Sequence, residues 1–274
     1  MLGEYDEATR LMREVLEAAR RARDVESITF ANVHLAWLYF MRADWETARR
    51  YLEENLQMPL SATRRRDVEQ RLRWIESDLV GAARLAQELL EHHRHSGEEQ
   101  GTYIYSGIAT WLHLELDETA KAHAAAADAA AILERSSEYL LWSPALYVLE
   151  ALIRGGDQHR GQALSDAAEA LGSEVNSPWG LLAARFGLGI LALEQRDADN
   201  AVRWFEESRH LANQLSPLVG TYVLRTLARA LAQRNGPGDK GLARKHLEEC
   251  VTIADRIGYA HAAARARAQL ATLS

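Results

Sequence analysis

Three histidines close together are the densest group of potential metal ligands in the chain. The segment ELLEHHRHSGEEQ contains His92, His93 and His95, and the first and last are three residues apart on a helix. Two imidazoles at this spacing can share a zinc ion, but no cysteine or well-placed carboxylate completes a tetrahedral site. Cationic residues also favour a helix C-terminus, and Gly97 follows. We therefore expect a helix end here and no metal site.

The single cysteine offers a second chemical possibility. Cys250 follows His246 by four residues, so the two side chains share a helical face. Cys250 also falls on an apolar stripe with Leu242, Ala243 and Leu247, which indicates a buried structural thiol. No G-x-S-x-G motif and no Cys–His nucleophile is present. We expect no catalytic residue, no cofactor and no enzymatic activity.

An arginine-rich stretch could contact phosphates. In RRRDVEQRLRW, Trp74 is preceded by Arg64, Arg65, Arg66, Arg71 and Arg73. Asp67 and Glu69 interrupt the basic run, and the whole chain carries a net charge of -7. Because nucleic-acid binding depends on concentrated positive charge, we expect no direct nucleic-acid contact. A polar helix face that lines a groove for an acidic partner is favoured instead.

The composition indicates what class of protein contains these residues. The chain has 274 residues, of which 47% are hydrophobic and 26% charged, as in ordinary globular proteins. No apolar run reaches the roughly 20 residues that a membrane span needs, and no signal-peptide pattern is present. A single cysteine, Cys250, cannot form a disulfide within the chain. We expect a cytoplasmic protein with no membrane contact.

Helical periodicity runs through nearly the whole chain, and its interruptions recur. Units such as RADWETARRYLEENL and RDADNAVRWFEESRHL begin with an acidic turn and continue with a small residue. The small residues are Ala8, Ala48, Ala82, Ala120, Gly161, Ala201 and Ala243, which are 34 to 42 positions apart. This period is typical of stacked helical hairpins. A small residue lets the two helices of a hairpin cross closely.

Serine–proline pairs predict where several helices begin. A serine can accept backbone N–H bonds as an N-cap, and proline suits the first helical position. Ser177-Pro178 and Ser216-Pro217 are therefore expected to start helices. Ser143-Pro144 is either a third start or a kink in a helix that begins near Ser137.

The segments GEYDEA, RADWETARRYLEENL and RDADNAVRWFEESRHLA resemble tetratricopeptide repeats, and the resemblance covers essentially the whole chain. The repeats are longer than the usual length of about 34 residues. This style, and the tail LARKHLEECVTIADRIGYAHAAARARAQLATLS, resembles the C-terminal helical regions of bacterial ATP-binding signalling regulators of the LuxR and maltose-regulator type. No Gly-Lys-Ser/Thr phosphate loop is present, so no ATPase activity is assigned to these residues.

The sequence therefore predicts an all-α fold, a right-handed α-solenoid of about six to seven helical hairpins. One solenoid is expected over 1–274. Its parts are a half repeat (1–25), repeats over 26–60, 61–97, 98–136, 137–173, 174–214 and 215–257, and a closing helix over 258–274.

Function in such an array is expected on the concave surface that the first helix of each hairpin lines. Aligning these helices on the small residues predicts ten inward-facing binding candidates. They are Trp37, Phe40, Arg71, Trp74, Tyr105, His113, Glu150, Phe186, Arg225 and Arg229. The same alignment also turns Phe30 inward. Aromatic side chains and arginines of this kind suit a peptide that carries apolar and acidic groups, although packing between repeats explains Trp37 and Phe40 equally well.

These observations favour a non-catalytic module that binds a protein or peptide, as the sensing arm of a larger bacterial signalling regulator. Two alternatives stay open. The first is a receptor for a small effector, sugar-like or peptidic, for which Trp37, Arg71, Trp74 and Tyr105 are the candidate cluster. The second is a stand-alone scaffold protein.

The first helix raises a separate expectation. Ala8, Met12, Val15 and Ala19 form an apolar face, widened by Leu11 and Leu16, with no preceding repeat in the chain to cover it. Because each solenoid unit buries its apolar face on the next, residues 5–20 are expected either to continue a longer protein or to self-associate.

Overall fold

The structure is a computed structural model that describes residues 2–273, with side chains from residue 5 onward. Its helices are α1 (Leu2–Ala22), α2 (Val25–Met41), α3 (Trp45–Leu56), α4 (Ala62–Ile75), α5 (Leu79–Ser96), α6 (Glu99–Glu115), α7 (Thr119–Leu133), the 3-10 helix η1 (Ser137–Leu141), α8 (Pro144–Arg154), α9 (Gln158–Glu174), α10 (Pro178–Glu194), α11 (Ala198–Leu215), α12 (Pro217–Arg234), α13 (Asp239–Arg256) and α14 (Ala260–Thr272). No strand occurs over these residues, which confirms the all-α class. The handedness of a solenoid and the number of its repeats stay predictions.

Local capping explains why many of these helices begin where they do. The carboxylates of Asp24, Asp44, Asp78 and Asp197 accept hydrogen bonds from backbone N–H groups two or three residues later. These bonds satisfy donors that a helix start leaves without partners. Helix boundaries of this kind follow from a few neighbouring residues, so the sequence pattern could locate them.

The serine–proline predictions hold in part. Pro144, Pro178 and Pro217 are the first residues of α8, α10 and α12, so Ser143-Pro144 is a start and not a kink. The Ser177 side chain accepts from the N–H of Gly180, as an N-cap should. Ser216 makes no cap bond. Its hydroxyl donates to the carbonyl oxygen of Met41 at 2.7 Å, because the folded chain brings α2 to the start of α12.

The small residues of the hairpins need one correction. Ala48, Ala82, Ala201 and Ala243 are fully buried and Gly161 is buried, but Ala120 is exposed. Ala122 is the buried residue of that hairpin. The reason is positional, since the N–H of the small residue bonds to the carbonyl of the residue four positions before, as in Ala82 to Asp78 and Ala122 to Glu118. The correct marker in these hairpins is therefore the fourth residue after the N-cap. Ala243, five residues after the N-cap Gly238, is an exception.

Enlarging one of these small residues should destabilise the fold. Ala82→Leu is expected to cost about 1–3 kcal/mol of unfolding free energy, because Ala82 is fully buried and extra methyl groups must push the two helices of the hairpin apart. Urea titration followed by circular dichroism measures the change. Val80→Leu is the matched control, since Val80 lies two residues earlier on the same helix and is 70% exposed. An equal effect of both substitutions would contradict the close-crossing explanation.

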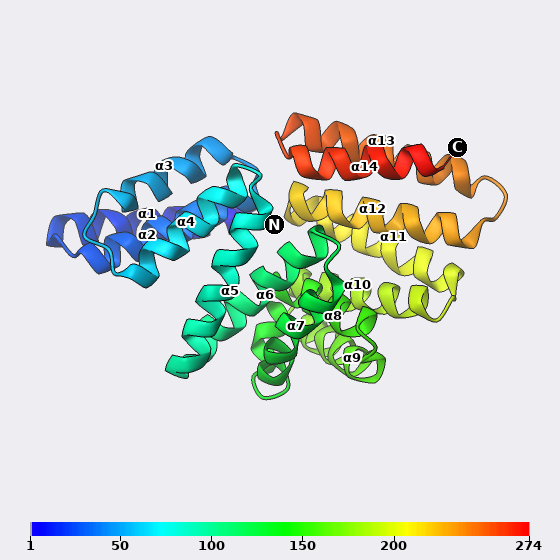
Figure 1. The fold of residues 1–274 in the computed structure, drawn as a ribbon, viewed down its shortest axis with the longest axis horizontal. Helices are drawn as coiled ribbons and strands as arrows, with labels where there is room; N and C mark the ends of the chain where they lie inside the picture. The colour runs from blue at the N-terminus through cyan, green and yellow to red at the C-terminus, as the bar shows by residue number, and fades with distance from the viewer. Residues whose placement is uncertain (1, 274) are drawn as a thin grey trace.

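Consecutive helices pack side by side, and the chain curls until its two halves meet (Figure 1). The indole N–H of Trp45, at the start of α3, donates to the carbonyl oxygen of Ile257 at the end of α13. The Trp45 and Tyr259 rings lie 6.1 Å apart. The turn between α13 and α14 therefore packs against the N-terminal part of the chain, and the inner helix faces enclose side chains.

Candidate binding surface

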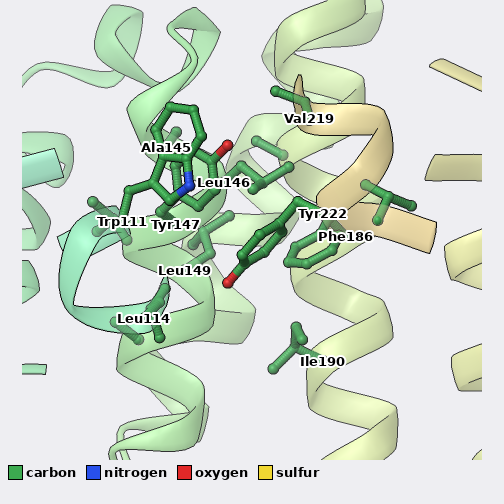
Figure 2. Packing of buried hydrophobic residues seen from close by; sticks show 14 of the residues in the cluster. Trp111, Leu114, Ala145, Leu146, Tyr147, Leu149, Phe186, Ile190, Val219 and Tyr222 are labelled. Carbon is green, nitrogen blue, oxygen red and sulfur yellow. The ribbon is translucent and has the colours of Figure 1, made fainter. Parts of the chain in front are cut away.

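A continuous series of aromatic rings runs between α4, α6, α8, α10 and α12. Together with α2, we call these the inner helices. Trp74 of α4 lies 4.5 Å from Trp111 of α6, which stacks on Tyr147 of α8 at 4.3 Å. Tyr147 meets Tyr222 of α12 at 5.2 Å, and Tyr222 lies 5.8 Å from Phe186 of α10. Figure 2 shows these last four rings closely packed. All five are buried, so they hold these helices together and expose little surface to a partner.

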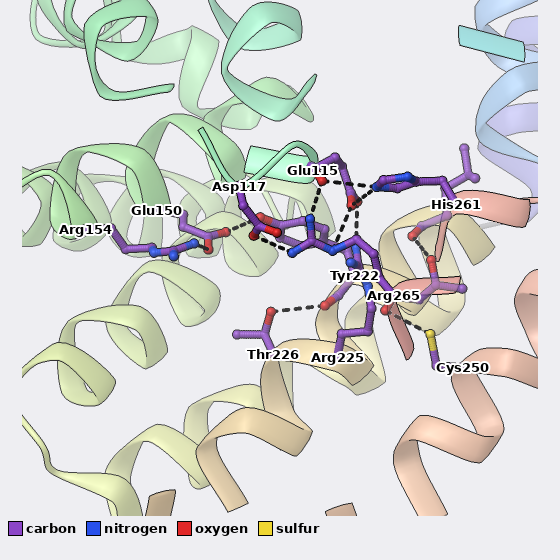
Figure 3. A network of polar contacts seen from close by, with 12 residues as sticks. Glu115, Asp117, Glu150, Arg154, Tyr222, Arg225, Thr226, Cys250, His261 and Arg265 are labelled. Carbon is purple, nitrogen blue, oxygen red and sulfur yellow. Dashed lines mark hydrogen bonds and ion pairs between the residues drawn. The ribbon is translucent and has the colours of Figure 1, made fainter. Parts of the chain in front are cut away.

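A buried ion-pair network joins the middle of the chain to its C-terminal helices (Figure 3). Glu115, at the end of α6, accepts from the Arg225 guanidinium of α12 at 2.6 Å. His261 of α14 lies 3.3 Å from the same carboxylate. Arg265 donates to the Glu115 carbonyl oxygen and pairs with Asp117 at 2.6 Å. We call these five residues the Glu115 cluster.

Burial alone would raise the pKa of Glu115, whose side chain is 1% exposed. Burial is the largest single influence, but the charge of Arg225, the hydrogen bond and charge of His261 and the charge of Arg265 together outweigh it and lower the pKa to about 2. The carboxylate is therefore charged at neutral pH. A charged group at this depth persists only when it is paired, so the cluster ties α6, α12 and α14 together.

A second polar contact joins α8 and α12 in the same interior. The Tyr222 hydroxyl donates to Glu150 at 2.5 Å, and the Arg154 guanidinium donates to the same carboxylate at 3.1 Å. Burial and the Glu150 charge raise the pKa of Tyr222 well above its ordinary value, so the hydroxyl keeps its proton and acts as a donor. No described group in this network is placed as a nucleophile with an adjacent base.

Of the ten predicted binding residues, most lie inside the protein. The following side chains are less than 9% exposed: Phe40, Trp74, Tyr105, His113, Glu150, Phe186 and Arg225. Only Trp37, Arg71 and Arg229 are partly accessible. The expectation that all ten line an open groove is therefore corrected, because the curling of the chain fills the inner surface with its own side chains. Burial of Trp74 likewise removes it as a stacking platform for nucleic acid.

Sequence reasoning found Arg225 but missed Glu115, His261 and Arg265. A signal for Glu115 was present, because it is an acid within the apolar run WLHLELD. An acidic residue among leucines at the end of a helix must be solvated or paired. Its partners could not be found locally, since Arg225 is 110 residues away in sequence.

Accessible aromatic and basic groups remain at the N-terminal end of the inner surface. Phe30 of α2 is 44% exposed, and its ring lies 4.0 Å from that of His34. Trp37 is half-buried, with the Arg71 guanidinium 5.5 Å from its ring centre. Arg64 of α4 is exposed, and none of the ion pairs among the described residues includes it. We call Phe30, His34, Trp37, Arg64 and Arg71 the α2–α4 patch.

An ion pair with Asp67 fixes the side chain of Arg71. The Asp67 carboxylate accepts from its Nε atom at 2.9 Å, and the two side chains are 11% and 3% exposed. Arg71 is thus largely neutralised by its neighbour and orients Trp37 through a cation–π contact. Arg64 is the member of the patch whose charge is available to an acidic group.

The histidine and cysteine side chains make contacts within the fold. His93 pairs with Glu98 at 2.7 Å and stacks on Tyr105 at 5.0 Å, while Gly97 ends α5 with a positive φ. Among the described residues, no three His, Cys, Asp or Glu side chains are grouped to hold a metal ion. Cys250 is fully buried, and burial raises the pKa of its thiol to about 12, which keeps it protonated. Leu242, predicted to share its buried stripe, is 46% exposed.

A cavity of about 630 Å³ that is open to solvent lies beside α1. Its lining includes Asp6, Arg10, Arg13, Glu17, Tyr39 and Arg42. The walls are mostly charged side chains that pair with one another, such as Arg42 with Asp6 at 2.8 Å.

None of the described helices is long and apolar enough to cross a membrane.

Comparison with known proteins adds little to this geometry. Neither a protein-family model nor a curated protein matches the chain. Among solved structures, the chain is similar to BtubC (BKLC) from P. vanneervenii, with 17% sequence identity and a TM-score of 0.40. The match covers 93% of this chain and 91% of that one. Similarity at this level does not establish a shared fold.

Proposed function

We propose that this chain is a non-catalytic binding module whose α2–α4 patch takes up a short protein segment with apolar and acidic side chains. One observation carries the proposal: Phe30 is 44% exposed on an inner helix, while the aromatic residues farther along the inner surface are buried. The Phe30 ring lies 4.0 Å from that of His34, on which the charge of Arg64 acts. An exposed aromatic ring and a guanidinium without an ion pair offer an apolar contact and recognition of a carboxylate.

Peptide selection tests this function. Short random peptides displayed on phage are selected against the wild-type chain, and their affinities are then measured by fluorescence polarisation. We expect peptides that combine an aromatic or aliphatic residue with Asp or Glu. Phe30→Ala and Arg64→Glu should each weaken binding about tenfold, because they remove the apolar contact and reverse the charge.

Two matched controls separate this patch from general surface effects. Leu242 on α13 is 46% exposed, so Leu242→Ala removes a similarly exposed apolar side chain elsewhere. Arg65 is exposed and adjacent to Arg64, so Arg65→Glu makes the same charge reversal on another face of α4. Selected peptides that bind Phe30→Ala and Arg64→Glu as tightly as the wild type would overturn the proposal.

A small-effector receptor is the second candidate, and a specific observation favours it. Several buried donors near the centre lack a hydrogen-bond partner among the described residues: the indole N–H of Trp111, the hydroxyl of Tyr147 and Nε of Arg225. Buried donors without a partner suit an acceptor-rich ligand. A thermal-shift screen with sugars and nucleotides tests this, since a ligand at about 100 times its Kd adds about 2.7 kcal/mol of stability.

The biological setting that we propose is the sensing arm of a larger bacterial signalling regulator in the cytoplasm. The resemblance of its repeats and tail to the helical regions of LuxR- and maltose-regulator-type proteins supports this setting. Sequencing the DNA on both sides of the reading frame tests it. A Gly-Lys-Ser/Thr loop upstream, or a helix-turn-helix downstream, would agree with the proposal, while stop codons at both ends would favour a stand-alone scaffold.

A further inference from the structure

The two ring nitrogens of His34, in the α2–α4 patch, have different surroundings. Its Nδ1 atom lies 2.9 Å from the carbonyl oxygen of Phe30, one turn earlier on α2. A carbonyl oxygen only accepts hydrogen bonds, so Nδ1 carries a proton and donates to it in both charge states of the ring. Its Nε2 atom takes part in none of the hydrogen bonds among the described residues. The proton that this imidazole gains or loses is therefore the one on Nε2.

The contact with Phe30 also places the His34 ring where a bound peptide would lie. The two ring centres are 4.0 Å apart, and both side chains are exposed. A peptide that covers the Phe30 ring therefore reaches the His34 ring as well. A neutral imidazole offers a carboxylate no donor at Nε2, whereas the protonated ring offers an N–H group and a positive charge.

The charged side chains that act on the ring come from α4. The charges of Arg71 and Arg64 disfavour a proton on His34, and that of Asp67 favours it. Asp67 is already paired with Arg71 at 2.9 Å. Tyr105 of α6 interacts with the same pair, but burial raises the pKa of its hydroxyl well above the ordinary value, so it stays neutral. The free patch therefore opposes a second positive charge beside its arginines.

Burial has the largest effect on the pKa of His34 and lowers it. The hydrogen bond to the Phe30 carbonyl raises the pKa and the two arginines lower it, and the result lies below the ordinary value for histidine. The ring of the free chain is therefore mostly neutral at pH 7. A peptide carboxylate on the patch acts against the arginines and favours the protonated ring.

We propose that His34 is a specificity-determining residue of the α2–α4 patch, and that the patch takes up a proton at Nε2 of His34 when an acidic peptide binds. The proposal rests on the peptide-binding function of this patch and adds a pH dependence to it. The extra affinity is full below the pKa of the free ring. It is lost as the pH rises through the higher pKa of the peptide-bound ring.

The affinity of the tightest selected acidic peptide, measured by fluorescence polarisation between about pH 5 and about pH 8, tests this linkage. Histidine titrates in this range, while Asp and Glu stay mostly ionised. A rise of one pKa unit on binding corresponds to an affinity up to about tenfold higher at the acidic end, which is the change that we expect. A flat profile for a peptide that binds well overturns this inference and leaves the binding function intact. Failure to select any peptide overturns both.

His34→Gln separates this ring from every other titrating group. Glutamine keeps a donor in the side chain but does not titrate, so the affinity of this variant should be nearly independent of pH. His159→Gln is the matched control, because His159 is also exposed but lies on α9, and it should keep the wild-type profile. Circular dichroism checks that both variants keep their helices. A His34→Gln profile as steep as that of the wild type would contradict the proposal.

Proton–nitrogen NMR of the imidazole ring locates the proton directly. The pKa of His34 should lie below its ordinary value in the free chain and rise when the peptide binds. Arg64→Gln should raise the pKa in the free chain, because it removes one of the two opposing charges. A peptide whose acidic residues are replaced by their amides should cause no rise. An equal rise with the amide peptide would exclude a carboxylate as the group that His34 recognises.

Discussion

Replacing Arg225 by methionine is expected to lower the free energy of unfolding by about 3–5 kcal/mol. The substitution removes the nearest positive charge from Glu115, whose carboxylate is 1% exposed and has its 2.6 Å contact with this guanidinium. His261 and Arg265 remain, but they lie farther from the carboxylate. Urea titration followed by far-ultraviolet circular dichroism measures the loss.

Arg10→Met is the matched control for this experiment. Arg10 also contacts a carboxylate, that of Glu7 at 2.5 Å, but its side chain is 54% exposed. Removing an exposed ion pair should change stability by less than about 1 kcal/mol. If Arg225→Met cost no more than Arg10→Met, the Glu115 cluster would not hold the two parts of the chain together.

The pH dependence of stability gives an independent check on the same cluster. The pKa of Glu115 is lowered from 4.5 to about 2 in the folded chain, because the positive charge of its partners outweighs burial. The unfolded state therefore binds the proton more readily. The stabilisation is full above pH 4.5 and is lost as the pH falls towards 2. Over this window, the urea midpoint of the wild type should fall more steeply than that of Glu115→Gln.

Trp74→Ala is expected to lower the unfolding free energy by a similar amount, about 3–5 kcal/mol. The Trp74 side chain is 2% exposed and meets Trp111 at 4.5 Å and Phe40 at 4.9 Å. Its removal leaves a cavity where helices α2, α4 and α6 come together. The same urea titration measures the change.

Trp142→Ala serves as the control, because Trp142 is 37% exposed and packs mainly on Tyr139, at 4.9 Å. We expect it to lose less than half as much stability as Trp74→Ala. A Trp74→Ala variant as stable as the wild type would mean that Trp74 occupies an open binding surface, as the sequence pattern suggested, and not the core.

Local features of the sequence were enough to place most of the helices. The acidic caps at Asp44, Asp78 and Asp197 act within three residues, and the proline starts at Pro178 and Pro217 fix the backbone at a single position. The wrong prediction that Ala120 is buried shows the limit of such local information. Two alanines in the same turn are equally small, and only their distance from the helix start separates the buried one from the exposed one.

The binding residues could not be found in the same way. The inner face of a helix has the same apolar and aromatic pattern whether it lines an open groove or packs on another part of the chain. Phe186 was predicted to face inward as a binding candidate, yet its side chain is buried. Phe30 follows the same pattern and is 44% exposed. Exposure depends on how far the chain curls, and that is a property of all the helix contacts together.

The sequence by itself therefore determined the helices and their order, because capping and a period of 3.6 residues act between near neighbours. The tertiary structure alone decided which inner faces meet. It brought Trp45 to Ile257 and Glu115 to Arg225, pairs that are 212 and 110 residues apart. The physical reason is that a buried charge is stable only beside its partner, and that partner is supplied by the folded chain as a whole.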